Sequence, residues 1–468
     1  MNISKFIHTV FIIFFIYFAA LAIYYFILAL IALTENRQKS KEHYFEDYSN
    51  LSASGFTFPV SIIIPAHNEE DWILDSLKAV LNLKYPEFEV IIVNDGSTDK
   101  TAQILASELK LRAVDMPHIP RFDAGKIQGT FKSDIYPNMA VISKAAGFKK
   151  AGAVNVGLEF AKYPYVCVVD GDTILEPDAL LEVMAQVEKD PGSIIGIGSF
   201  FGLVNGFKVK NGVILEKSFS FNPIIANQNL EYMRSFMLER AAWSKFNASP
   251  NVAGGFGIWR RDILLHLGGY ATDFSSEDIE FTFRAQDYII EKKKEGYKIL
   301  ALPYCVGWTE GPSDIISLIS QRNRWQRVIN ETIWKYKHMI LSPRYKTFAF
   351  LTLPYYLFYE SLGVFIELAS IILIVAGALA RVLDLKAFLA FVVLIVLSQA
   401  VISLLSIFAF ARGQKVLRTK DIIYFIFLSF AEYFWYHWIL LIAKILGTID
   451  FLRGFRGYDQ YQRSKRRD

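Results

Sequence analysis

Tyr165-Val-Cys-Val-Val-Asp170-Gly-Asp172 predicts a buried strand that ends in two carboxylates. Its five consecutive apolar or β-favouring residues are typical of a strand that is covered on both faces. Ligands of an open parallel sheet bind just beyond the carboxyl ends of its strands, so we expect Asp170 and Asp172 at a ligand site. Two hard oxygen donors this close together suit Mg²⁺ or Mn²⁺, which bind a few carboxylates and the phosphates of a substrate. An ordinary Asp-Gly turn after the strand is the alternative interpretation.

The composition indicates a membrane-anchored protein with one substantial soluble domain. The chain has 468 residues, of which 53% are hydrophobic and 21% charged, and its mean hydropathy is +0.28. This is too apolar for an ordinary soluble protein and too charged for a chain that lies wholly in a bilayer. The net charge of +4 argues against a nucleic-acid-binding protein with a basic stripe.

The cysteines and histidines indicate neither a disulfide framework nor a zinc site. Cys167 and Cys305 are the two cysteines, and Cys167 lies within the apolar strand. The seven histidines are scattered, without ligand spacing such as His-x-x-x-His. We therefore expect neither a disulfide nor a thiolate metal site.

An uncharged apolar segment from Phe6 to Leu33 is long enough to cross a bilayer as a helix. A signal peptide is the competing interpretation, because Ala20-Leu21-Ala22 resembles a cleavage site; the apolar run continues beyond it, which favours an uncleaved span. Positive charges are more numerous after the segment than before it. The positive-inside rule therefore predicts that residue 35 onward is cytosolic.

Strands alternating with helices predict a soluble α/β domain with a parallel sheet and right-handed crossovers. Val60–Pro65 and Glu89–Asn94 are short β-branched strands, and apolar residues at helical spacing occupy Glu70–Leu83 between them. A further helix follows Asp99, a suitable N-cap residue. The segment Val114–Lys150 mixes Pro, Gly, Lys and Asp without a period, and we predict an insertion or mobile loop there.

Three apolar blocks after residue 341 predict further membrane helices: Phe348–Ala380, Phe388–Ala411 and Ile422–Leu446. The first is too long for one span and too short for two, so we expect an interfacial helix followed by a span. This makes four spans in total. The basic loop between the last two blocks is expected in the cytosol, whereas the basic tail conflicts with the span count, which leaves the side of the tail open.

Four ionisable residues lie in or beside these apolar blocks, where charge is costly: Glu360, Glu367, Glu432 and His437. Two roles are open for them, in a translocation path or as interfacial or interhelical partners. The predicted regions are a membrane helix (1–35), a cytosolic catalytic domain (36–341), interfacial and membrane helices (342–450) and a basic tail (451–468).

Two other predicted strands also end in polar residues. Pro65-Ala-His67-Asn-Glu69 follows the first strand and Asn94-Asp95-Gly-Ser-Thr-Asp99 follows the second, although a plain turn with an N-cap also explains the latter. The chain has no Gly-x-x-x-x-Gly-Lys-Ser/Thr loop, and Gly196-Ile-Gly198-Ser-Phe-Phe-Gly202 carries one residue too many for the dinucleotide fingerprint. We interpret this stretch as strand and turn. Neutralisation of a diphosphate would then fall to a metal and to basic side chains.

The motifs occur in the order found in one family: Pro65–Glu69, Asp95–Asp99, Lys150-Ala-Gly-Ala-Val-Asn155, Asp170-Gly-Asp172, Gly254–Arg261, Glu277-Asp278 and Gln321-Arg-Asn-Arg324-Trp325. From Val60 to Arg327 the chain resembles the membrane-bound inverting glycosyltransferases with a GT-A fold, namely cellulose, chitin, hyaluronan and poly-N-acetylglucosamine synthases; ceramide glucosyltransferases carry a related set. The resemblance implies an α/β GT-A domain with a mixed, mostly parallel sheet, flanked by transmembrane helices.

The resemblance also implies a role for each motif. Asp95 would contact the uracil of a nucleotide-sugar donor, with Pro65, His67 and Glu69 beside it. Asp170 and Asp172 would hold Mg²⁺ or Mn²⁺ and the donor's diphosphate or ribose.

The remaining roles concern the diphosphate, the general base and the acceptor. Lys150 would contact the diphosphate, with Lys149 and Lys126 as possible substitutes, because the distance from Asp99 to Lys150 is longer than usual. Asp278, beside Glu277, would be the general base. Gln321 and Arg324 would lie at the diphosphate, and Trp325 would stack on the acceptor sugar. Considered alone, the acid pair also suits a helix start, and the Arg-Trp cluster a juxtamembrane anchor.

The implied function is transfer of a sugar from a cytosolic UDP-sugar, UDP-GlcNAc or UDP-Glc, to a growing β-linked polysaccharide of the poly-N-acetylglucosamine or chitin type. The alternatives are a single addition onto a lipid acceptor, of the ceramide or polyprenyl-phosphate type, and an inactive transport or scaffold subunit. The complete set of Asp95, Asp170, Asp172, Asp278 and Gln-x-x-Arg-Trp favours an active enzyme. The donor sugar, the linkage and any accessory subunits are left open.

Overall fold

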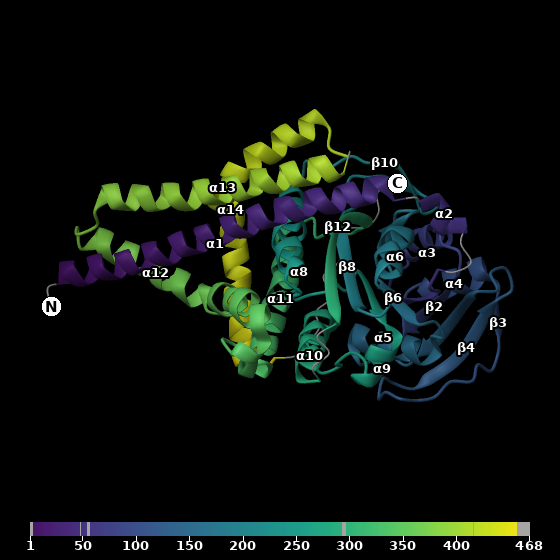
Figure 1. The fold of residues 1–468 in the computed structure, drawn as a ribbon. Helices are drawn as coiled ribbons and strands as arrows, with labels where there is room; N and C mark the ends of the chain where they lie inside the picture. Colours follow the sequence, from purple (N-terminus) through teal and green to yellow (C-terminus); the bar gives the residue numbers. More distant parts are fainter. Residues whose placement is uncertain (1–2, 47, 54–56, 293–295, 415, 456–468) are drawn as a thin grey trace.

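The computed structural model describes residues 3–46, 48–53, 57–292, 296–414 and 416–455. A sheet domain occupies one half of the molecule, and long helices extend away from it (Figure 1). The helices α1, α12 and α13 run out together from the sheet domain, and α1 packs against both of the others.

The strands are β1 (Val60–Ala66), β2 (Phe88–Asp95), β3 (Leu111–Ala113), β4 (Ile127–Ser133), β5 (Met139–Lys144), β6 (Tyr165–Val169), β7 (Ile174–Leu175), β8 (Ile194–Leu203), β9 (Lys208–Lys210), β10 (Val213–Glu216), β11 (Phe256–Arg260) and β12 (Lys298–Thr309).

The α-helices are α1 (Ile3–Phe45), α2 (Tyr48–Ala53), α3 (Ile73–Leu81), α4 (Thr101–Leu109), α5 (Lys149–Phe160), α6 (Ala179–Lys189), α7 (Pro223–Arg234), α8 (Ala241–Lys245), α9 (Arg261–His266), α10 (Glu277–Glu291), α11 (Ile315–Lys335), α12 (Gly363–Leu379), α13 (Leu385–Gly413) and α14 (Thr419–Leu452). The π-helical segments are η1 (Ser235–Arg240), η4 (Phe348–Thr352) and η5 (Tyr355–Ser361), and the 3₁₀ turns are η2 (Lys337–Met339) and η3 (Pro343–Tyr345).

The central sheet has ten strands in the order β3-β4-β5-β2-β1-β6-β11-β8-β12-β7. Strands β5, β2, β1 and β6 are parallel, and β11 runs antiparallel between β6 and β8. The sheet is therefore mixed, as the resemblance implies. Parallel pairing predominates only in its centre, because most of the remaining pairings are antiparallel. The carboxyl ends of β1, β2 and β6 meet at one edge, as the strand motifs predict.

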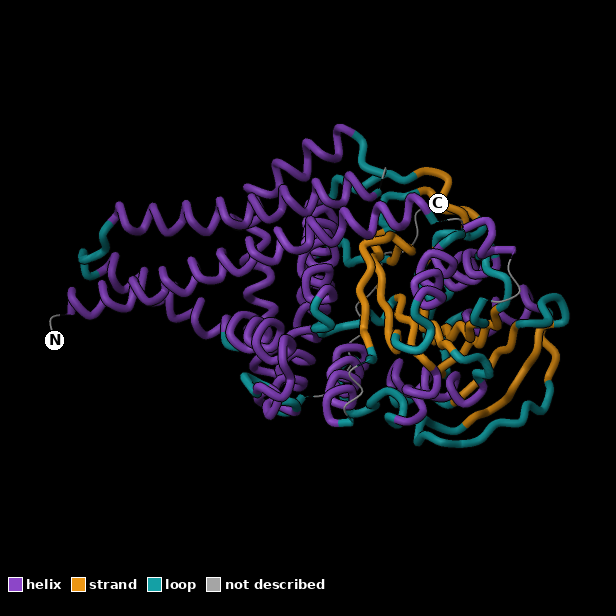
Figure 2. The backbone as a smooth tube through the Cα atoms, in the orientation of Figure 1, coloured by secondary structure: helices purple, strands orange, loops and turns teal. Residues whose placement is uncertain are grey.

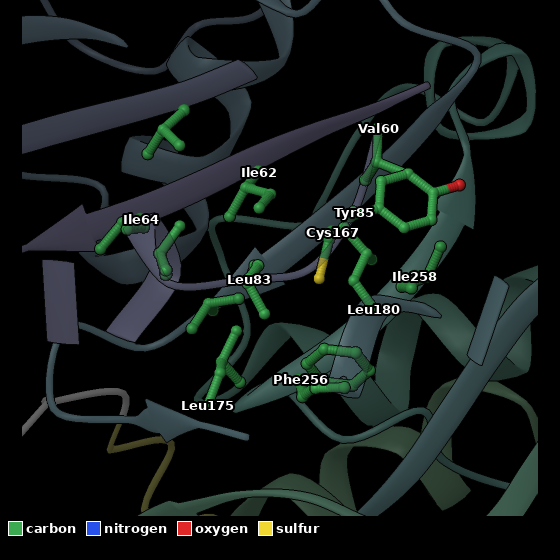
Figure 3. Packing of buried hydrophobic residues seen from close by; sticks show 14 of the residues in the cluster. Val60, Ile62, Ile64, Leu83, Tyr85, Cys167, Leu175, Leu180, Phe256 and Ile258 are labelled. Carbon is green, nitrogen blue, oxygen red and sulfur yellow. The ribbon is translucent and has the colours of Figure 1, made fainter. Parts of the chain in front are cut away.

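Apolar side chains fill both faces of the sheet, which is why its central strands are continuous apolar runs. On one face Ile62, Ile64, Cys167 and Phe256 belong to one buried cluster (Figure 3). On the opposite face Ile63 is buried with Phe281 of α10. Figure 2 shows helices beside the central strands, whereas the strands at the outer edge of the sheet lie at the surface. Both cysteines are buried and free.

The segment Val114–Lys150 corrects one sequence prediction. It contains β4 and β5, and β5 pairs in parallel with β2 inside the sheet rather than forming a mobile loop. Strand β4 is partly exposed and pairs antiparallel with β5. Strands near a sheet edge carry polar residues and a weak apolar period, which explains why the sequence pattern did not reveal them.

A smaller correction concerns Asp99, which we expected to be the N-cap of the next helix. The helix α4 begins at Thr101, so Asp99 lies one residue too early for that position. Its carboxylate nevertheless accepts a hydrogen bond from the Thr101 N–H at 2.9 Å.

The described helices include three that are long and apolar enough to cross a membrane, within Ile7–Phe45, Leu385–Gly413 and Thr419–Leu452. Phe348–Ser361 and Gly363–Leu379 form a pair bent by 45° and give a fourth candidate if they are one span. This bent pair occupies the block for which we expected an interfacial helix and a span. The helix α1 continues to Phe45, past the predicted boundary at residue 35. Residues 456–468 of the basic tail lie outside the described residues.

Tryptophan packing explains the glycine-rich stretch of β8. A Cβ on Gly196 would lie 2.3 Å from the ring of Trp259 in β11, and one on Gly202 would lie 2.4 Å from the ring of Trp308 in β12. Both indoles are buried. The absence of side chains at these glycines leaves space for the two indole rings against the sheet. The whole stretch Gly196–Gly202 is a strand, without the turn that we predicted.

We predict that Gly196→Ala destabilises the protein by about 1–3 kcal/mol, because the added methyl group overpacks Trp259. Thermal unfolding of the purified protein in detergent measures this effect. Gly192→Ala is the matched control, since a Cβ there meets no atom within 4 Å. Equal melting temperatures for the two variants would contradict the prediction.

Candidate active site

One cavity of about 1340 Å³ contains all the residues to which the motifs assign a role in the site. It begins at the carboxyl edge of the sheet and extends between the long helices. The predicted residues among its walls are Pro65, His67, Glu69, Asp95, Lys150, Asp170, Asp172, Glu277, Asp278, Gln321, Arg324 and Trp325. The fold thus brings the separate motifs to one place.

The ends of β1 and β2 form one end of the cavity. The Nδ1 atom of His67 lies 2.7 Å from the Asp95 carbonyl oxygen. The carboxylate of Asp95 is buried and forms an ion pair with Lys144, the last residue of β5. Burial raises the pKa of Asp95 above its ordinary value, and the hydrogen bond from Lys144 opposes that rise. Lys144, which does not line the cavity, therefore fixes the position of the Asp95 carboxylate.

The two aspartates after β6 have different surroundings. Asp170 binds the Lys150 ammonium at 2.6 Å. Asp172 is buried and accepts a hydrogen bond from the Thr309 hydroxyl at 3.1 Å. Burial, together with the negative charges of Asp170 and Glu310, raises the pKa of Asp172 to about 7. Negative charge is concentrated at this point of the cavity.

Lys150 lies at the centre of the charged groups. Besides Asp170, its ammonium binds Glu277 at 3.1 Å and donates to the Gly254 carbonyl at 2.9 Å. Burial disfavours its charge, but Asp170 and Glu277 together raise the pKa of Lys150 well above its ordinary value. The lysine therefore joins the strand-end carboxylates to the acid pair.

The two lysines considered as substitutes for Lys150 have other positions. Lys149 also lines the cavity, but its ammonium donates to the Phe274 carbonyl at 2.9 Å. Lys126 is not among the lining residues. The geometry favours Lys150 for the role that the motif implies.

The acid pair begins α10, as its composition predicts, and also faces the cavity. Asp278 accepts hydrogen bonds from the Gly254 N–H at 3.1 Å, the Ser276 hydroxyl at 3.0 Å and the Ile279 N–H at 2.9 Å. These bonds fix the orientation of its carboxylate. Glu277 instead shares the Lys150 ammonium. The two acids therefore differ in their electrostatic surroundings.

The Gln-x-x-Arg-Trp motif lies on α11, where Trp325 is 36% exposed and lines the cavity. The Arg322 guanidinium lies 3.9 Å from the centre of the Trp325 ring and donates to Gln321 at 2.5 Å. This contact covers part of the indole and orients it.

The sequence did not reveal a network of hydrogen bonds around Arg322, the residue that contacts Trp325. Arg322 binds Glu231 of α7 at 2.7 Å, and the Tyr436 hydroxyl of α14 donates to the same carboxylate at 2.5 Å. Arg322 was visible only as part of a basic cluster, and nothing in the local sequence marks Glu231 or Tyr436. Their proximity follows from the packing of three helices that are distant in the chain.

The deeper part of the cavity lies among the long apolar helices and is nevertheless polar. Glu360 accepts hydrogen bonds from Lys444 and from the Tyr355 hydroxyl, each at 2.8 Å. The four ionisable residues singled out from sequence all line this part and are paired: Glu360 with Lys444, Glu367 with His437, and Glu432 with Arg234. They are therefore interhelical partners as well as lining residues.

The carboxylates at the strand ends are suitable donors for a divalent cation. Asp170 and Asp172 supply hard oxygen atoms, and the pKa of Asp172 is raised by burial and then by the negative charges of Asp170 and Glu310, which a cation would neutralise. Within the described part of the chain, no group of three or more His, Cys, Asp or Glu side chains is placed to hold a metal ion. The donor set therefore suits an ion that takes few ligands from the protein.

Two family profiles match the chain. Glycosyl transferase family group 2 matches residues 165–443, and glycosyl transferase family 2 matches residues 61–265. Among curated proteins, the poly-beta-1,6-N-acetyl-D-glucosamine synthase of Staphylococcus epidermidis is 28% identical over 274 residues, which are 58% of this chain and 55% of that protein. The synthase of the same name from Staphylococcus aureus is 26% identical over the same shares. The chain spans about half the length of these relatives.

A solved structure has the same fold. The mannosyltransferase from Pyrobaculum calidifontis, in complex with GDP-Man and Mn²⁺, superposes with a TM-score of 0.55 at 16% identity, over 93% of this chain and 99% of that one. At this identity the likeness concerns the fold alone. It confirms the expected GT-A architecture.

Glu280 supports the site from outside the cavity and is fully buried. Its carboxylate accepts hydrogen bonds from Arg284 at 2.7 Å, and from Lys335 of α11 and the adjoining Tyr336 at 2.8 Å each. Although burial raises its pKa, Arg284 and Lys335 lower the pKa of Glu280 below the ordinary value of 4.5. This group ties the helix of Asp278 to the helix of Trp325.

We predict that Glu280→Gln destabilises the protein by about 1.5–3 kcal/mol at neutral pH, the usual contribution of a hydrogen bond to a charged group. The native state binds fewer protons than the unfolded state at this site, so the stabilisation is present above pH 4.5 and is lost as the pH falls through the lower folded-state pKa.

Thermal unfolding at about pH 7 and about pH 3.5 measures this difference between wild type and variant. Glu108→Gln, on the exposed face of α4, is the control and should leave the melting temperature unchanged at both pH values. A destabilisation by Glu280→Gln that stays constant with pH would mean that charge is not its cause.

Proposed function

The chain belongs to glycosyl transferase family group 2, and from this membership we propose that it is a membrane-embedded inverting glycosyltransferase. The donor is a UDP-sugar, with UDP-GlcNAc favoured by the likeness to poly-beta-1,6-N-acetyl-D-glucosamine synthases. The acceptor is a growing β-linked polysaccharide. The sheet domain, with residues 36–341, faces the cytosol, where the donor is available.

The continuity of the cavity is the observation that carries this proposal. A single space connects Asp95, Asp170 and Asp172 with Trp325 and then with the polar groups around Glu360. Buried charge among apolar helices is costly and usually marks a path for a polar substrate. Tyrosines and paired charges offer hydrogen bonds to hydroxyl groups and suit a sugar chain better than the acyl chain of a lipid acceptor.

The donor would occupy the sheet end of the cavity. Asp95 accepts a hydrogen bond from the base, with Pro65, His67 and Glu69 beside it. A diphosphate would then lie between the strand ends and α11, in the part of the cavity that is lined by Lys150, Gln321 and Arg324.

Asp170 and Asp172 would hold a divalent cation, Mg²⁺ or Mn²⁺. The Mn²⁺ in the complex of the archaeal mannosyltransferase agrees with this proposal. A bound cation would neutralise the charge that develops on the departing diphosphate. The remaining ligands would come from the diphosphate and from water, which Mg²⁺ usually retains.

Asp278 would act as the general base. A sugar hydroxyl is a weak nucleophile at neutral pH, so a carboxylate must take its proton while the new bond forms at the anomeric carbon and the bond to the diphosphate breaks. Glu277 shares the Lys150 ammonium, which makes it the weaker candidate. Trp325, oriented by Arg322, would present its ring to the acceptor sugar.

The function is tested with the purified full chain, Mn²⁺ and a panel of radiolabelled UDP-sugars, followed by sizing of the product. We predict a polymer from one UDP-sugar and complete loss of transfer in EDTA. A single sugar attached to an extracted lipid would support the alternative single-addition enzyme. No transfer from any donor, in protein that remains folded, would overturn the proposal.

The role of Asp278 gives a second prediction. Asp278→Asn keeps the size of the side chain but removes its basicity, so kcat should fall about 10²–10⁴-fold while UDP affinity changes little. A UDP-release assay measures turnover, and calorimetry with UDP and Mn²⁺ measures binding.

Glu291→Gln, at the exposed far end of the same helix, is the matched control and should turn over normally. Normal turnover of Asp278→Asn would leave Glu277 or Asp273 as the candidate base. A loss of UDP binding as large as the loss of turnover would move Asp278 to the donor site.

A further inference from the structure

Lys144 is a completely buried lysine that the proposed chemistry does not use. It is the last residue of β5 and is paired in register with Asp95, the last residue of β2. None of its surface is exposed. Fully buried lysines are rare unless they are paired, so this position calls for a specific explanation.

The ammonium of Lys144 has a complete set of acceptors. It forms an ion pair with the Asp95 carboxylate and donates to the carbonyls of Ala145 and Gly147, each at 2.9 Å. An ammonium has three N–H donors, and these three acceptors use them all. Gly147 and Asp95 line the donor end of the cavity, whereas Lys144 lies behind them.

The surrounding backbone leaves room for this lysine. Gly125 has a φ of +102°, and a Cβ there would lie 3.0 Å from the Lys144 Cε. Gly96, immediately after Asp95, has a φ of +60°, and a Cβ there would lie 2.6 Å from the Ala146 nitrogen. The turn after β2 and the turn after β5 are therefore packed closely around the ion pair.

The charge of Lys144 decides what Asp95 can offer to a ligand. Burial alone would favour a protonated Asp95, which presents an O–H group and a neutral carbonyl acceptor; the ammonium favours the ionised form, in which both oxygens are charged acceptors. An N–H donor on a base edge, such as the N3–H of uracil, requires an acceptor.

We propose that Lys144 is a positioning residue for donor recognition, which keeps the Asp95 carboxylate ionised and oriented to accept a hydrogen bond from the base. This inference rests on the proposed role of Asp95 in the donor site. It also gives the segment Val114–Lys150 a function, because β5 places the lysine at the end of β2.

The test compares the affinities of UDP and of N3-methyl-UDP, which lacks the N3–H, for the full-length protein with Mn²⁺ by calorimetry. In the wild type UDP should bind about tenfold to a hundredfold more tightly, the effect of one hydrogen bond to a charged acceptor. In Lys144→Met this ratio should fall about fivefold or more, because a neutral Asp95 makes a weaker hydrogen bond to the N3–H. A lysine with a purely structural role would weaken both ligands equally and leave the ratio unchanged.

Two further variants complete the design. Lys162→Met is the matched control, because Lys162 pairs with Glu89 near the opposite end of the same strand β2, and its ratio should equal that of the wild type. Lys144→Gln is uncharged but retains a donor for the turn carbonyls, and it replaces the methionine variant if that variant does not fold. The same fall in the ratio is expected.

The outcomes distinguish the contact between Asp95 and the base from the role of Lys144. A ratio of about one in the wild type overturns the contact between Asp95 and the base, and the role of Lys144 with it, while sugar transfer from the same preparation shows whether the proposed function stands. A high ratio in the wild type that persists in the folded Lys144 variants overturns the role of Lys144 alone.

Discussion

The concentration of negative charge at one edge of the sheet is the constraint on which the site depends. Parallel strands deliver their carboxyl ends to the same edge, and here those ends carry Asp95, Asp170 and Asp172. Asp170 and Asp172 repel each other, and cations placed among such carboxylates offset the repulsion. Lys144 forms an ion pair with Asp95 at the end of β2. Lys150 forms ion pairs with Asp170, which follows β6, and with Glu277 of α10. Burial and the negative charges of Asp170 and Glu310 raise the pKa of Asp172.

The same principle extends into the long helices. Glu360, Glu367 and Glu432 each bind a basic partner on another element, so the helices carry charge without exposing it to an apolar environment. Arg234 belongs to α7 of the sheet domain and reaches Glu432 of α14. This ion pair consequently connects the two halves of the molecule, and the residues of all three pairs line the cavity.

The sequence predicted the parts of the structure that depend on local pattern. Apolar strands ending in Asp170-Gly-Asp172 and in Asn94-Asp95 were recognisable because both faces of these strands are buried. The ordered motifs then placed the family and the fold. Features that depend on how strands pair could not be predicted from the sequence. Strands β4 and β5 lack a clear apolar period, and Lys144 is buried because β5 aligns it with Asp95. Likewise, Glu231 and Glu280 gain their partners only when α7, α10 and α11 pack together.

The contacts of α1 have a consequence for the biogenesis of the protein. Tyr17 and Tyr24 donate to the carbonyls of Phe358 and Leu351, and Tyr25 bonds to the Tyr355 hydroxyl. Residues of this first helix also form a wall of the cavity. During synthesis α1 therefore leaves the ribosome long before the segment that completes its hydrogen bonds, and the sheet domain emerges in between. The hydrogen bonds of these tyrosines can form only after the bent segment has been made, so the wall that α1 contributes to the cavity is completed later than the sheet domain.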